Sequence, residues 1–97
     1  MSIFNWFKRK EQPSLFSGGN GESFETAVVV NADNSFAGVM AEYAYVASEC
    51  GQPQADWKMK SQSLKEHNGK PYDVLNVVLS NGQDRSFYFD ISKFFGK

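Results

Sequence analysis

The sequence has a single cysteine, Cys50, and a single histidine, His67, among its 97 residues. One cysteine excludes a disulfide within the chain, which fits a reducing compartment. One cysteine and one histidine also fall short of the several ligands that a zinc site needs. We therefore expect no metal and no cofactor. His67 is predicted at a hairpin tip and Cys50 at a helix C-terminus, where the helix dipole disfavours a thiolate, so neither suggests a catalytic pair.

Long apolar runs are also missing from the sequence. No stretch approaches the roughly 20 residues of a membrane span, and residues 1–12 contain no apolar run of signal-peptide length. The default expectation is a cytoplasmic protein.

Basic residues are absent from residues 11–57, which carry seven acidic side chains. Residues 1–10 carry three basic and no acidic side chains, and residues 58–97 carry seven basic and four acidic ones. The net charge is −1 and the basic residues form no dense run, so we expect no binding to nucleic acid. The uneven charge either balances within the fold or serves a partner.

The length predicts one domain, and a hydrophobic content of 41% is enough for a core. Within it, residues 1–23 are predicted to be an N-terminal amphipathic segment with a glycine-rich linker, and residues 24–97 a single α+β domain. Residues 2–10 suit a short helix that must dock or fray, because so few residues are not stable alone. A weak contact with a membrane surface is the alternative role for residues 1–10. The glycines at 17–23 precede a strand, unlike a phosphate-binding loop.

Residues 24–31 predict a strand, and residues 33–50 predict the one long helix, ended by Gly51 and Pro53. The apolar stripe expected to lie on the sheet is Phe36, Val39, Met40, Tyr43, Val46, Ala47 and Cys50. Small residues beside that stripe suit close approach by a second element or a second subunit; they are Ala37, Ala41, Ala44 and Ser48. The remaining wedge is expected to face water, and it contains Gly38, Glu42, Tyr45 and Glu49.

Residues 55–91 predict a three-stranded antiparallel meander with Asn-Gly turns. A two-residue first loop pairs Trp57 with Ser80, whereas a three-residue loop pairs Trp57 with Leu79 and Met59 with Val77. We favour the three-residue loop. It collects one core face, consisting of Trp57, Met59, Leu75, Val77, Leu79, Phe87, Phe89 and Ile91.

The predicted fold class is therefore α+β: a short N-terminal helix, then β-α-β-β-β. One helix packs on one face of a mostly antiparallel four-stranded sheet. Because one helix covers only one side of a sheet, the opposite face is expected to stay open for binding. Residues 92–96 are expected to make a closing turn, with Phe94 and Phe95 folding back.

No converging catalytic set is present, so we expect a non-enzymatic protein-interaction or self-assembly domain, with a homodimer as one form. The alternatives are membrane-surface association through residues 1–10 and a small-ligand or nucleic-acid-binding sheet. An enzyme is the least supported class. The candidate interaction surface comprises Phe4, Trp6, Phe7, Ala37, Ala41, Ala44, Lys58, Lys60, Val74, Val78 and Tyr88.

Overall fold

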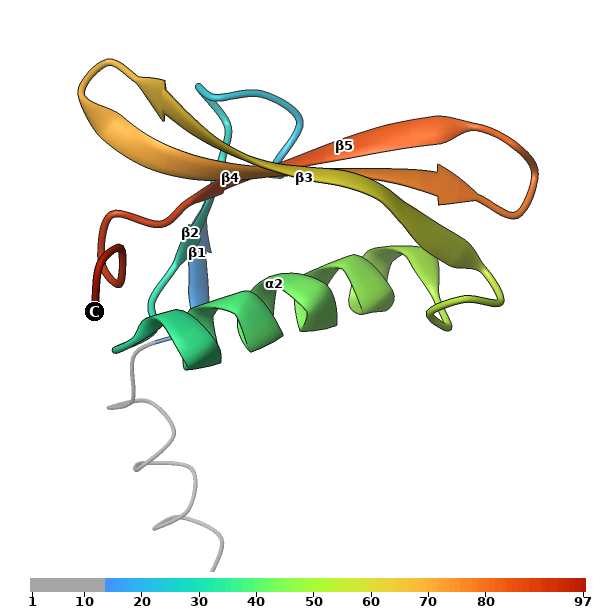
Figure 1. Ribbon diagram of the computed structural model, residues 1–97, viewed down its shortest axis with the longest axis horizontal. Coiled ribbons are helices and arrows are strands. Elements are labelled where there is room, and N and C mark those ends of the chain that lie inside the picture. Colours follow the sequence, from blue (N-terminus) through green and yellow to red (C-terminus); the bar gives the residue numbers. More distant parts are fainter. Residues whose placement is uncertain (1–13) are drawn as a thin grey trace, which may run out of the picture.

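The computed structural model describes residues 14–97, in which one helix packs against a five-stranded mixed sheet (Figure 1). The elements in chain order are β1 (Phe16–Gly18), β2 (Val28–Val30), α2 (Ser35–Cys50), β3 (Trp57–His67), β4 (Lys70–Leu79) and β5 (Asp84–Asp90). The predicted α+β class is confirmed. The helix expected within residues 2–10, and with it Phe4, Trp6 and Phe7, lies outside the described residues.

The strands lie side by side in the order β1-β2-β5-β4-β3. Neighbours are antiparallel except β2 and β5, which run parallel. The observed sheet differs from the predicted one in two details. It has five strands and not four, and the pair of β2 with β5 is parallel. The strand before the helix lies inside the sheet, between β1 and β5.

The fifth strand comes from the segment that we expected to be a linker. Phe16 pairs with Val30 and Gly18 pairs with Val28. A side chain at Gly19 would collide with the backbone of Thr26 across the connection between the two strands. The glycines therefore allow two backbones to approach closely, and they do not mark a linker.

Strand β2 is shorter than the expected span of 24–31. The residues before it form turns instead, in which the Thr26 N–H donates to the Ser23 carbonyl and the two hydroxyls lie 2.9 Å apart. Such local hydrogen bonds compete with a strand ladder. The ladder accordingly begins at Val28.

The β3–β4 hairpin turns through two residues, Asn68 and Gly69, with φ of 52° and 77°. The three-residue loop that we favoured is therefore wrong. Its strand pairs are nevertheless right, because Trp57 lies opposite Leu79 and Met59 opposite Val77. A β-bulge between Met59 and Ser61 supplies the extra residue that we had placed in the loop.

Helix α2 begins and ends close to its predicted bounds of 33–50. The Asn34 side chain accepts a hydrogen bond from the Ala37 N–H at 2.9 Å, and the Gly51 N–H donates to the Ala47 carbonyl at 2.8 Å. These caps satisfy backbone groups that a helix end leaves unpaired.

The orientation of α2 differs from the prediction. Phe36 is 78% exposed, Met40 60% and Tyr43 39%, so these members of the expected stripe do not lie on the sheet. The buried residues are Gly38, Ala41, Glu42 and Val46. Gly38 and Glu42 were expected to face water, and this expectation is wrong.

Crowding beneath the helix explains the rotation. The ring of Phe94, which is 2% exposed, lies so close to Gly38 that any side chain at that position would strike it. The sheet already presents the large rings of Phe87 and Phe89. Small residues on the helix therefore fit this layer better than Phe36 or Met40, because interiors are filled to a fixed density.

The predicted core face of the meander is confirmed. Trp57, Leu75, Val77, Phe87, Phe89 and Ile91 belong to the buried cluster, with Met59 and Leu79 packed against it. The closing turn at residues 92–96 buries Phe94 but leaves Phe95 49% exposed. Among the described residues, no helix combines the length and apolar character required to cross a membrane.

Candidate functional site

The side of α2 that faces away from the sheet is apolar, and we call it the outer face. Its exposed members are Phe36, Ala37, Met40, Tyr43, Ala44 and Ser48. Figure 1 shows this side of the helix turned away from the strands, with no described segment lying over it. Phe36, Met40 and Tyr43 follow the four-then-three spacing that places residues on one side of a helix.

The outer face carries no charged side chain. The only charged residues within α2 are Glu42 and Glu49. Glu42 is fully buried against the sheet, and Glu49 pairs with Arg85 of β5 at 3.2 Å. A surface helix of a monomer usually presents charged residues to water, whereas a helix that is apolar all round is covered on all sides. The composition of α2 thus suits a helix held between two layers.

Tyr43 is fixed at the border of this face. Its hydroxyl donates to the Gln62 Oε1 at 3.1 Å, and its ring centroid lies 6.4 Å from that of Trp57. The bulge at Lys60 shifts the alternation, so Gln62 lies opposite Leu75 on the helix side.

The small residues that we predicted to be an interaction flank are divided by the structure. Ala37 and Ala44 are exposed on the outer face, whereas Ala41 is 4% exposed and packs in the core. The 16-residue helix has only two charged residues, which are too few to cover a solvent-facing side, but this count does not say which side of α2 meets the sheet.

The sheet face opposite α2, which we call the reverse face, is only partly open. Val74 is 6% exposed, and Val78 and Tyr88 are half-buried. Lys58 is exposed, while Lys60 lies in the bulge and pairs with Asp84 at 3.1 Å. The structure thus corrects the expectation of a wholly open reverse face, and the candidate residues there are not one free surface.

The loop of residues 19–27 crosses one end of the reverse face, above the sheet in Figure 1. The Gly21 carbonyl accepts a hydrogen bond from the Tyr88 N–H at 2.8 Å. The Phe24 ring stacks on His67 with centroids 4.3 Å apart, and it meets Tyr72 and Tyr88 edge-on. Phe24 therefore anchors the loop, a role that the sequence did not reveal.

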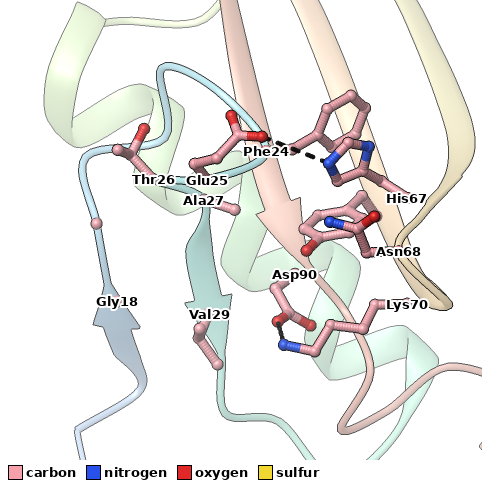
Figure 2. Close-up of a pocket in the computed structure, with 12 residues that line it drawn as sticks. Gly18, Phe24, Glu25, Thr26, Ala27, Val29, His67, Asn68, Lys70 and Asp90 are labelled. Carbon is pink, nitrogen blue, oxygen red and sulfur yellow. Dashed lines mark hydrogen bonds and ion pairs between the residues drawn. The ribbon is translucent and has the colours of Figure 1, made fainter.

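A pocket of about 510 Å³ lies between this loop and the β3–β4 turn (Figure 2). The Lys70 Nζ lies 3.2 Å from the Asp90 Oδ2, so these two charges offset each other, and the exposed Glu25 carboxylate lies 3.4 Å from the His67 Nε2. The pocket consequently offers shape and aromatic walls, but it does not specify the charge of a ligand.

Asp90 is held ionised at the floor of this pocket. Burial by itself raises the pKa of Asp90, but hydrogen bonds from Ser92 and the ion pair with Lys70 outweigh burial and lower that pKa below its ordinary value. The same pair raises the pKa of Lys70. This arrangement fixes the start of β4 to the end of β5.

Beneath α2, the carboxyl groups of Glu42 and Asp73 face each other in the core. Burial, with the neighbouring Asp73 carboxyl, raises the pKa of Glu42 to about 10. Neither carboxyl oxygen of Glu42 has a hydrogen-bond partner, so an ionised Glu42 would be buried without any donor. Glu42 is therefore protonated and uncharged at neutral pH.

Cys50 and His67 lie in different parts of the structure, at the end of α2 and at the end of β3. Cys50 is half-buried at the end of α2, and its Sγ lies 3.8 Å from the Arg85 Nη1. Burial raises the pKa of the Cys50 thiol despite this guanidinium. Within residues 14–97, no three His, Cys, Asp or Glu side chains lie close enough together to hold a metal ion.

No model of a known protein family, no curated protein and no solved structure matches this chain.

Proposed function

We propose that this protein is a small protein-interaction domain, and that it docks a partner through the outer face of α2. The single observation that carries the proposal is the combination of large exposed apolar side chains with a complete lack of charge on that face. Phe36, Met40 and Tyr43 together expose on the order of 350 Å², which lies in the range of functional patches on small proteins.

The partner surface that fits is itself apolar and helical. The outer face is a ridge of Phe36 and Met40 beside the small residues Ala37 and Ala44. Ridges of this kind pack into the grooves of another helix. An acidic, basic or nucleic-acid partner would find no counter-charge on this face.

Photo-crosslinking in cells that express the protein tests this function. A photoreactive amino acid replaces Met40 on the outer face, and a matched protein carries it at Lys58 on the reverse face. We expect position 40 to give discrete protein adducts, identified by mass spectrometry, and position 58 to give few. Adducts from position 58 alone, or none from position 40, contradict the proposal.

A further inference from the structure

The proposed function does not identify the partner. The outer face has the features of a surface that is complementary to a second copy of itself. Its members lie at positions 36, 40 and 43, and Ala47 and Cys50, which are half-buried against the core, continue the same alternation of four and three. This is the spacing of a coiled-coil seam. A seam without charge meets its own copy without repulsion, which a two-fold symmetric interface requires.

The seam is also uneven along its length. The large side chains Phe36 and Met40 occupy the half near the helix N-terminus, whereas Ala44, Ala47 and Ser48 occupy the other half. Two antiparallel copies would set the large half of each helix on the small half of the other. Two parallel copies would place Phe36 against Phe36 and leave a gap between the alanines, and gaps of this kind are unfavourable.

Charges at the two ends of α2 favour the same arrangement. At its start, the Ser35 N–H donates to the Lys97 carbonyl at 3.2 Å, and Lys93 and Lys97 line one hollow with Asp33. At its end lie the Glu49 carboxylate, which pairs with Arg85 at 3.2 Å, and the Asp56 carboxylate, which accepts from the Gln52 N–H at 2.7 Å and leaves this end with excess negative charge. Antiparallel copies bring the lysine-bearing end of one chain to the carboxylate-bearing end of the other.

From these observations we infer that the partner is a second copy of this chain, packed antiparallel through the outer face of α2. This inference rests on the proposed function. A helix of 16 residues is about 24 Å long, and its outer face offers on the order of 400 Å² per copy, about half of what a standard interface buries on each side. The dimer is therefore expected to be weak and to depend on concentration.

Light scattering on the purified full chain, from low micromolar to near-millimolar concentration, tests the dimer. We expect the mass to rise from 10.9 kDa toward twice that value. Met40→Asp should weaken the dimer at least about tenfold, because it buries a charge in each copy. Lys58→Asp is the matched control: Lys58 is exposed on the reverse face of the sheet, and this variant should associate like the wild type.

A cysteine trap tests the antiparallel order. The protein carries Phe36→Cys and Ser48→Cys together with Cys50→Ser, and it is oxidised at high concentration. Cleavage after Glu42 separates the two new cysteines. Peptides joined between position 36 of one copy and position 48 of the other support the inference. Links of 36 to 36 and 48 to 48, or no links between chains, overturn it.

Failure of the dimer and failure of the proposed function give different results. A purified chain that stays monomeric at every concentration, or a dimer equally weakened by Met40→Asp and Lys58→Asp, overturns the second copy as partner. Crosslinks from position 40 to a different protein would then leave the proposed function standing. Binding of the monomer to lipid vesicles, lost in Met40→Asp, would overturn both.

Discussion

Glu42 is the residue whose surroundings differ most from those its side chain prefers. Its exposed fraction is 0%, yet its ordinary pKa of 4.5 would leave it ionised at neutral pH. Burial and the Asp73 carboxyl raise the pKa to about 10, so folding at neutral pH requires the uptake of a proton. The buried pair of Glu42 and Asp73 therefore lowers the stability of the fold at neutral pH. It lies beneath the helix that carries the candidate interface.

This proton uptake predicts an unusual dependence of stability on pH. A folded-state pKa above the unfolded value means that the stabilising contribution is full below about 4.5 and is lost as the pH rises toward about 10. The free energy of unfolding should fall between pH 5 and pH 9, by on the order of 1 kcal/mol per pH unit at most. Urea denaturation at pH 5, 7 and 9 measures it.

Glu42→Gln removes the titrating group, and its amide donates a hydrogen bond to the Asp73 carboxylate. The variant should be more stable than the wild type at pH 9 and should lose most of the slope. Glu49→Gln is the control, because Glu49 is exposed and pairs with Arg85. A wild type that is equally stable at pH 5 and pH 9 would contradict the protonated pair.

Gly38 shows how a single position sets the rotation of α2. Alanine is favoured over glycine in a helix interior by about 1 kcal/mol. Here the added methyl group would strike the buried Phe94 ring. Gly38→Ala should therefore lower the free energy of unfolding by about 1 to 3 kcal/mol, whereas Ser48→Ala on the outer face should change it little. Thermal and urea unfolding compare them, and a more stable Gly38→Ala would refute the contact.

Among the elements, strand β3 contains the one irregularity of its ladder, the bulge at Lys60. Deleting Lys60 should leave the fold intact, because Met59 then stays opposite Val77 while Ser61 stays opposite Asn76. We expect a loss of about 1 kcal/mol or less, mainly from the exposed pair with Asp84.

The matched control is deletion of Val74 from the partner strand β4, where the ladder against β5 is regular. That deletion turns neighbouring side chains to the opposite face and should cost several kcal/mol or prevent folding. Circular dichroism and urea unfolding compare the two proteins. An unfolded Lys60 deletion would show that the bulge holds the hairpin, contrary to this account.

For the whole molecule, local signals in the sequence were sufficient for the helix ends, the positions of the two Asn-Gly turns and the inward face of the meander. They failed where distant segments meet. The sequence near Gly38 does not indicate that Phe94 packs against it. The glycines at 18 and 19 are equally compatible with a flexible segment and with a close pair of strands. The orientation of α2 depended on those contacts.

The candidate site shows the same limit. The residues of the apolar stripe were identified from their spacing, but Phe36 and Met40 face away from the sheet and Tyr43 lies at the border of the outer face. Periodicity finds a stripe without saying what covers it. The pocket beside Phe24 joins residues from four separate segments, so no single stretch of sequence pointed to it.

Oxidative footprinting of the methionines tests the central claim most directly, because the chain offers an outward and an inward one. Met40 is 60% exposed, and Met59 packs against the core. In the dilute full chain, Met40 should be oxidised much faster than Met59, and its rate should fall as the protein concentration rises toward millimolar. Equal protection of both residues in the dilute protein, or a Met40 rate that never changes with concentration, would contradict an outward-facing, self-docking helix.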